Sequence, residues 1–257
     1  MEDESAFGEA YAIVRDLRVR CAWDRAQTPQ SLRPYLREEV AELEEALLEG
    51  DEARIASELG DLLLHFIFQV DLAEERGAFT MADVARTLIA KMKRRHPHLY
   101  GAGAGESWER QKIAERAEHA RAKGLESGVL GHLPPTLTDL EKAFRYQERA
   151  AAVGFDWDDL EGPLDKLEEE VAETRVHPQE EIGDVLFAAV NVARKAGVHP
   201  TAALEAATNK FVMRFRMVEK LAAERGIEVE TAGLAVLDAL WDEVKAAERG
   251  AQETSSK

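Results

Sequence analysis

The sequence predicts an all-α protein made of two similar helical units. Apolar residues recur every three or four positions along most of the chain, and Ala, Leu, Glu and Arg are abundant, a pattern that favours helices. No alternating apolar and polar stretch is long enough to predict a pair of strands. Several charged motifs of the first half also return in the same order in the second half, which indicates a tandem duplication.

Four helices are predicted in the first half. The apolar stripe of the first consists of Leu36, Val40, Leu43 and Leu47. Gly50 ends this helix, and Asp51 can cap the next. Thr80 begins the third helix with Asp83 in the position of the capping-box acid, and Pro97 stops it. The predicted ranges are 32–48, 52–75, 80–96 and, with a weaker pattern, 107–123.

The segment 124–135 holds the richest concentration of Gly, Ser and Pro in the chain, a composition typical of a linker. It predicts a domain at 1–125, a linker at 126–135 and a second domain at 136–257. Helical patterns in the second domain predict helices over 136–152, 160–175, 179–196, 200–225 and 231–248. The polar tail 250–257 is expected to fray.

Charge and composition exclude several classes of protein. The formal net charge of −17 argues against a general affinity for nucleic acid, because few cations are available to neutralise phosphates. The longest apolar stretch, 62–70, contains His65 and Gln69 and is far shorter than the ~20 residues of a membrane-spanning helix. The single cysteine, Cys21, excludes a disulfide framework within the chain, and a cytoplasmic location is expected.

Two acidic motifs and two cationic pairs carry the duplication. Leu-Arg-Glu-Glu-Val-Ala-Glu at 36–42 matches Leu-Glu-Glu-Glu-Val-Ala-Glu at 167–173. Ser-Glu-Leu-Gly-Asp-Leu-Leu at 57–63 matches Glu-Glu-Ile-Gly-Asp-Val-Leu at 180–186. The Lys/Arg pair Lys91/Arg95 returns as Lys210/Arg214, and the Trp/Lys pair Trp108/Lys112 returns as Trp241/Lys245. Because both copies keep polar residues as well as apolar ones, the repeat indicates a repeated site.

The spacing of the acidic residues predicts a metal site. Residues three or four apart share a helix face, so Glu38, Glu39 and Glu42 point into one sector. Glu58 and Asp61 share a face of the next helix. If the two helices pack antiparallel, these carboxylates converge, and a bound cation relieves their repulsion. Oxygen-only ligands favour Mg²⁺ or Mn²⁺ over zinc.

The cationic pairs predict a phosphate site beside the metal. A Lys and an Arg one turn apart place two cations on one helix face, and Arg can hold a phosphate with two hydrogen bonds. The Trp and Lys of the second pair add a flat aromatic surface next to another cation. Together the motifs predict a site for a polyphosphate that carries an aromatic base.

These motifs carry a resemblance. Glu-Glu-x-x-Glu at 38–42 followed by Glu-x-x-Asp at 58–61, repeated at 169–173 and 181–184, resembles the signature of the MazG family of all-α nucleoside triphosphate pyrophosphohydrolases. The segments 23–28, 91–98, 153–157 and 209–211 are similar to those of its two-domain bacterial members. The resemblance covers essentially the whole chain. It implies tandem MazG-like four-helix-bundle units, a homodimer, and Mg²⁺-dependent hydrolysis of nucleoside triphosphates to monophosphate and pyrophosphate in a house-cleaning role.

The resemblance also implies roles by position. In the second unit, Glu169 orients or deprotonates the attacking water, and the expected catalytic residues are Glu169, Glu170, Lys210 and Arg214. The metal ligands are Glu170, Glu173, Glu181 and Asp184, the phosphates are held by Lys210, Arg214 and Lys245, and Trp241 lies near the nucleoside. The corresponding residues of the first unit are Glu39, Glu42, Glu58 and Asp61 for the metal, with Lys91, Arg95, Trp108 and Lys112 for the substrate.

Two differences between the copies predict unequal units. Seven residues separate Glu173 from Glu181, whereas the corresponding segment of the first copy is longer, so the second hairpin is short. Asn191 of the second copy corresponds to Phe68 of the first. An amide suits a ligand-binding face and a phenyl ring suits a core, so Asn191 is expected to bind substrate. We therefore predict that the second unit is the better catalyst and that the first is weaker, regulatory or structural.

Other classes of function remain open on the sequence. A non-catalytic nucleotide sensor would keep the same metal and phosphate residues. A di-iron bundle needs Glu-x-x-His pairs on two helices, which this chain lacks. A structural helical adaptor would have no reason to repeat the cationic pairs in register. The sequence specifies neither the preferred base and sugar nor which phosphorus is attacked.

Overall fold

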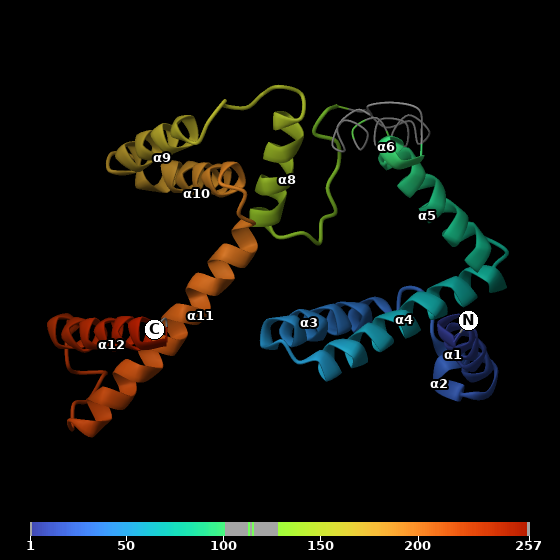
Figure 1. Ribbon diagram of the computed structural model, residues 1–257. Coiled ribbons are helices and arrows are strands. Elements are labelled where there is room, and N and C mark those ends of the chain that lie inside the picture. The colour runs from blue at the N-terminus through green and yellow to red at the C-terminus, as the bar shows by residue number, and fades with distance from the viewer. Residues whose placement is uncertain (1, 101–112, 114, 116–127, 256–257) are drawn as a thin grey trace. The chain divides into compact units, whose positions relative to one another are not determined.

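The computed structural model describes residues 2–100, 113, 115 and 128–255. It divides into two compact units, Met1–Gly105 and Glu106–Lys257, each of which is described by itself (Figure 1). No strand occurs in these ranges, which confirms the all-α class. Trp108, Lys112 and nearly all of the helix predicted at 107–123 lie outside the described residues. The domain limits at 1–125 and 136–257 stay predictions.

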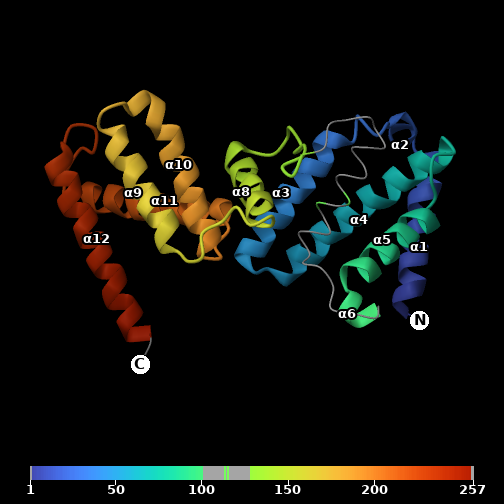
Figure 2. The same ribbon diagram turned by 90° about the horizontal axis from the view of Figure 1, so that it is seen from above.

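The first unit is built on a helical hairpin. Its helices are α1 (Glu2–Arg20), α2 (Ala22–Ala26), α3 (Arg33–Glu49), α4 (Glu52–Glu75), α5 (Met81–Arg95) and α6 (Pro97–Tyr100). α3 and α4 pack against each other (Figures 1 and 2). Gly50 ends α3 at a positive φ of 69°, and the Asp51 carboxylate caps α4 by accepting from the Ala53 and Arg54 amides. Thr80 and Asp83 form the predicted capping box of α5. α1, α2 and α6 were not predicted.

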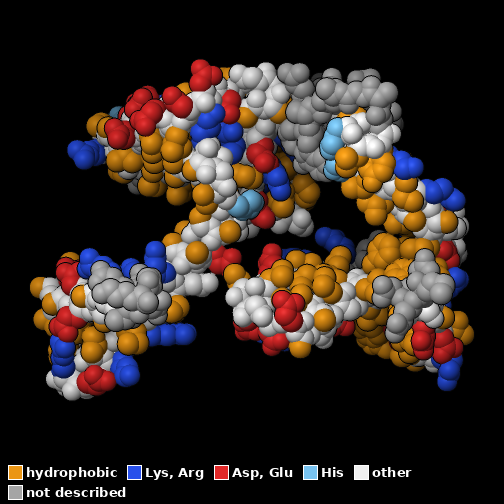
Figure 3. All heavy atoms as spheres, viewed as in Figure 1, with side chains coloured by type: hydrophobic (Ala, Val, Ile, Leu, Met, Phe, Trp, Pro, Cys, Tyr) orange, Lys and Arg blue, Asp and Glu red, His pale blue; other side chains and the backbone are white. Residues whose placement is uncertain are grey.

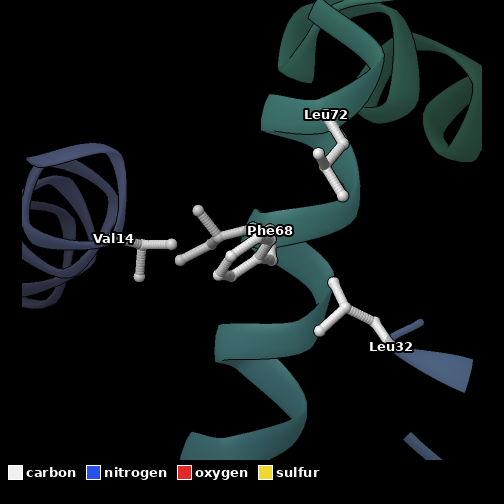
Figure 4. Close-up of a cluster of buried hydrophobic side chains, with 5 residues drawn as sticks. Val14, Leu32, Phe68 and Leu72 are labelled. Atoms are coloured by element: carbon white, nitrogen blue, oxygen red, sulfur yellow. The ribbon is translucent and has the colours of Figure 1, made fainter. Parts of the chain in front are cut away.

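The core of the first unit lies between α1 and α4. Val14 of α1 packs with Leu32, Ile67, Phe68 and Leu72 (Figure 4). Phe68 is 3% exposed, which confirms the expectation that a phenyl ring at this position belongs to the core. Burial of apolar side chains is the main stabilising contribution of such a cluster.

The second unit contains a second hairpin and a separate helix pair. Its helices are α8 (Asp139–Ala151), α9 (Glu161–Thr174), α10 (Pro178–Lys195), α11 (Pro200–Glu224) and α12 (Leu234–Ser255). α9 packs against α10, α8 packs against α10, and α12 packs against α11 around Val218, Ala222, Leu240 and Val244. The tail expected to fray is helical as far as Ser255. Its Ala, Gln and Glu residues favour helix, and no proline interrupts them.

Among the described residues, no helix combines the length and apolarity that crossing a membrane requires.

Candidate functional site

Three carboxylates of the second unit converge on the α9–α10 hairpin. Glu170 and Glu173 lie on α9, and Glu181 lies in the first turn of α10. One oxygen of each lies within 4.8 Å of the others. Two oxygens bound to one Mg²⁺ at about 2.1 Å are at most about 4.2 Å apart, so small side-chain rotations would let all three share an ion. The packing of α9 against α10 brings these three side chains together.

The carboxylates of this group repel one another. The pKa of Glu181 is raised, first by partial burial and then by the charges of Glu173, Asp184 and Glu170. Asp184 is exposed and lies outside the group of three, although its charge still acts on Glu181. A raised carboxyl pKa and converging oxygens are the features expected of a cation site that is built from carboxylates.

Lys166 is a member of the site that the sequence interpretation missed. Its Nζ lies 2.7 Å from Oε1 of Glu170 and 2.9 Å from Oε1 of Glu169, and these contacts raise the pKa of Lys166. Glu170 is buried, whereas Glu169 is exposed. The available signal was a lysine one turn before the acidic motif, but the first copy has Tyr35 at this position, so the repeat did not reveal it.

The first unit contains a matching acidic group. Oxygens of Glu39, Glu58 and Asp61 lie within 4.8 Å of one another on α3 and α4. Burial raises the pKa of Glu39, and the charges of Asp61, Glu42 and Glu58 raise it further. Glu42 is exposed and lies outside the group. The predicted convergence of carboxylates from two antiparallel helices is therefore found in both units, with three members rather than four or five.

The phosphate-binding residues predicted in the second unit gather on α11 and α12. The Arg214 guanidinium lies 5.8 Å from the centre of the Trp241 ring. Its Nε and Nη2 donate to Oε2 of Glu248 at 2.9 and 2.7 Å. Lys245 pairs with Asp242 at 2.8 Å, and Lys210 is exposed on α11. The structure thus brings the cations and the indole together.

Glu248 was also missed, although a signal was present. The pattern Trp-x-x-x-Lys-x-x-Glu at 241–248 occurs at 108–115 as well, so the glutamate is repeated together with the Trp/Lys pair. The hydrogen bonds that Arg214 donates are the main cause of the lowered pKa of the Glu248 carboxyl, and the positive charge of Arg214 lowers that pKa further. Glu248 fixes the direction of the Arg214 side chain.

The cations and the carboxylates of the second unit form separate groups. No hydrogen bond or ion pair within 128–255 joins Lys210, Arg214 or Lys245 to the acidic group on α9 and α10. Figure 3 shows acidic side chains gathered over α9, and both basic and acidic side chains over α11 and α12. In the first unit, Lys91 and Arg95 lie on α5, whereas the acidic group lies on α3 and α4. One chain therefore presents the predicted site in two parts.

Asn191 lies on α10, about two turns beyond Asp184. It is 9% exposed, and its Oδ1 accepts a hydrogen bond from Nε of Arg194 at 2.8 Å. The amide predicted to bind substrate is thus held on the same helix as two of the predicted metal ligands.

Comparison with known proteins identifies relatives of the whole chain. A family model described as the MazG nucleotide pyrophosphohydrolase domain matches residues 27–100. The nucleoside triphosphate pyrophosphohydrolase/pyrophosphatase MazG of Thermotoga maritima is 42% identical over 246 residues, which cover 93% of this chain and 95% of that protein. The nucleoside triphosphate pyrophosphohydrolase of Escherichia coli K12 is 36% identical over 249 residues, which cover 90% and 93%.

Proposed function

Because the chain belongs to the MazG family, we propose that it is a hydrolase that cleaves nucleoside triphosphates to the nucleoside monophosphate and pyrophosphate. The observation that carries this proposal is the group formed by Glu170, Glu173 and Glu181, whose oxygens lie within 4.8 Å of one another. Because the chain has a net charge of −17, it can bind a highly charged anion only where cations compensate its own carboxylates.

The acidic residues fit Mg²⁺, with Mn²⁺ as a substitute. Glu170, Glu173 and Glu181 would hold the ion, and Asp184 is placed to join them after a side-chain movement. The donor set is made of oxygen atoms alone, as these ions prefer. Burial raises the pKa of Glu181, and the charges of the neighbouring carboxylates raise it further. When bound, the ion would polarise phosphoryl oxygens and lower the pKa of a water molecule.

The chain's own residues position the reactants. Glu169 is exposed next to the acidic group and can accept the proton of an attacking water once Lys166 moves aside. Lys210 and Arg214 hold the phosphates, with Lys245 nearby. Trp241 lies near the nucleoside. Such a site acts mainly by alignment and charge stabilisation in an in-line displacement.

We propose that a second copy of the chain completes the site. The acidic group and the cations of one chain are separate, so the cations of one copy can serve the acidic group of the other. The α9–α10 hairpin exposes the apolar residues Val171, Ile182 and Leu186, and two such hairpins packed together would form a four-helix bundle. The homodimer is thus part of the proposed mechanism.

The second unit is proposed as the main catalytic unit. It combines an acidic group with the buried amide of Asn191, whereas Phe68 of the first unit is part of the core. We further propose that the protein removes non-canonical or excess nucleotides. We also propose a cytoplasmic location, which is in line with the single cysteine.

A substrate panel tests the proposed reaction. Canonical and deaminated or oxidised nucleoside triphosphates are incubated with the full chain in Mg²⁺, in Mn²⁺ and in EDTA, and pyrophosphate and orthophosphate are measured separately. We expect pyrophosphate as the primary product and no turnover in EDTA. Orthophosphate as the primary product would contradict the reaction class, and binding without turnover would favour a nucleotide sensor.

A further inference from the structure

The second unit contains a cavity of about 250 Å³ that none of the predicted metal or phosphate residues lines. Its wall includes the aromatic side chains of Tyr146, Phe155, Trp157 and Phe187, together with Asn191 and Arg194. The volume lies below the range of roughly 300–1,000 Å³ that is typical of sites for whole drug-sized ligands. The cavity therefore suits one flat aromatic group rather than a whole nucleotide.

A chain of hydrogen bonds fixes the amide of Asn191 at this cavity. Arg194 donates from Nε to Oδ1 of Asn191 at 2.8 Å. Its two terminal nitrogens donate to the Asp156 carboxylate at 2.5 and 3.2 Å. Because the arginine side chain has only donors, the accepting atom of Asn191 must be its oxygen. The amide nitrogen is consequently the remaining polar group of Asn191, and it can only donate.

The loop that closes the cavity is anchored to α10. Lys195 lies 3.3 Å from Oδ2 of Asp156 and also donates to the backbone oxygen of Trp157. The Trp157 ring lies against Gly162, where an added Cβ would come within 2.0 Å of the ring. The glycine therefore leaves the space that the ring occupies. Phe155, in contrast, is 83% exposed at the cavity, where it can cover an entering ring.

The corresponding place in the first unit is filled. By the offsets of the repeat, Tyr146 corresponds to Val14 and Asn191 to Phe68. Val14 and Phe68 pack in the core of the first unit (Figure 4). The same part of the fold is thus closed by apolar side chains in one unit and open, with an oriented donor, in the other. Packing alone does not require this difference.

We propose that the cavity of the second unit binds the nucleobase of the triphosphate, an inference that rests on the proposed function. The base lies among the aromatic side chains, and the amide nitrogen of Asn191 donates to a carbonyl oxygen or ring nitrogen on its edge. Asn191 and Asp184 are seven residues apart on α10, about 10 Å along the helix axis, which leaves room for the sugar between the acidic group and the base. Arg194 and Asp156 are positioning residues that hold the amide.

Calorimetric titration in EDTA tests the base site separately from hydrolysis. The full chain is titrated with nucleoside 5′-monophosphates and with ribose 5-phosphate, which lacks the base. We expect the monophosphates to bind at least tenfold more tightly than ribose 5-phosphate. Asn191→Phe, which fills the cavity as Phe68 fills the first unit, should reduce monophosphate binding to the level of ribose 5-phosphate. Asn191→Leu keeps the size and removes the donor, and should weaken monophosphate binding up to about tenfold.

Ala189→Phe is the matched control, because Ala189 is exposed on α10 and does not line the cavity. It should bind as the wild type does. Equal binding of monophosphates and ribose 5-phosphate, or unchanged binding by both Asn191 variants, would overturn the proposal. Base-dependent binding without triphosphate hydrolysis would refute the proposed function and leave the base site standing. Hydrolysis without base-dependent binding would refute the base site and leave the proposed function standing.

Discussion

At the scale of single residues, Asp156 shows how one carboxylate sets the shape of a loop. Hydrogen bonds from Arg194 are the main cause of its lowered pKa, and Lys195 lowers the pKa further against the opposing effect of burial. A carboxyl group whose pKa is lower in the folded state stabilises the fold above its ordinary pKa near 3.9. This stabilisation is lost as pH falls through the lowered value.

Asp156→Asn is therefore expected to reduce the free energy of unfolding by about 1–3 kcal/mol at pH 7. The difference from the wild type should shrink as pH falls below 4, because protonation removes the same charge from the wild type. Urea unfolding at pH 7, 5 and 3 measures this difference. Asp158→Asn is the control, because Asp158 lies in the same loop and makes none of the ion pairs that join Asp156 to Arg194 and Lys195. A difference that stays constant down to pH 3 would contradict the role of the charge.

Two ion pairs between α11 and α12 separate a functional effect from a structural one. Arg214 pairs with Glu248, and Arg225 pairs with Glu243 at 2.6 and 2.9 Å. Both pairs connect the same helices, but only the first includes a predicted phosphate ligand. Glu248→Gln should raise KM for a triphosphate and lower kcat/KM about tenfold, equivalent to about 1.4 kcal/mol. Glu243→Gln should leave both constants near those of the wild type.

Thermal unfolding of the two variants completes this comparison. Both lose one partly exposed ion pair, so their Tm values should fall by similar small amounts. Equal kinetic losses in the two variants would show that Glu248 acts through general stability and would contradict its positioning role.

Single functional residues were predictable from the sequence mainly where both copies of the repeat contain them. The converging carboxylates were predicted because helix geometry fixes which residues share a face. Lys166 was not, since its importance depends on the rotamer that brings Nζ to Glu170. The contact between Arg194 and Asp156 was also missed, because a contact over 38 positions in the sequence leaves no local pattern.

At the scale of helices, caps and breakers predicted the boundaries well. Gly50, Asp51 and Thr80 mark helix ends as expected. α1 was not predicted because Val14 is its only buried side chain among residues 5–20, so the segment lacks an apolar stripe. Helix α12 extends past the predicted end because a polar sequence without a breaker stays compatible with helix.

The first unit's core gives a prediction at this scale. Phe68→Ala should lower the free energy of unfolding of the first unit by about 3–5 kcal/mol, because it removes a buried ring from the α1–α4 contact. Leu59→Ala, at a side chain that is 51% exposed on α4, is the control and should cost much less. Guanidinium unfolding monitored by circular dichroism measures both. A loss below 1 kcal/mol for Phe68→Ala would contradict the assignment of this ring to the core.

At the scale of the whole molecule, the separation of acids and cations predicts complementation between copies. Glu181→Gln and Arg214→Gln chains should each be nearly inactive. When they are expressed together, heterodimers should contain one intact site, because one copy supplies the acids and the other the cations. Random pairing in a two-fold symmetric dimer should restore about a quarter of wild-type activity. The measurement is pyrophosphate release by the copurified mixture.

Absence of any recovery in proven heterodimers would mean that both groups of one chain form a single site. The sequence could not predict whether the acidic group and the cations of one chain form a single site. Residue spacing shows which side chains share a helix face, but it does not show which helices pack together. Composition and repeats were nevertheless sufficient for the fold class and the family.

The most direct test of the central claim compares matched glutamates in the two acidic groups. Pyrophosphate release from a nucleoside triphosphate in Mg²⁺ is measured for the wild type, for Glu181→Gln and for Glu58→Gln, which removes the corresponding residue of the first unit. We predict that Glu181→Gln lowers kcat/KM at least about 100-fold, a loss of roughly 2.7 kcal/mol of transition-state stabilisation, and that Glu58→Gln keeps most of the activity. Wild-type turnover by Glu181→Gln would contradict the claim that the α9–α10 carboxylates form the catalytic metal site.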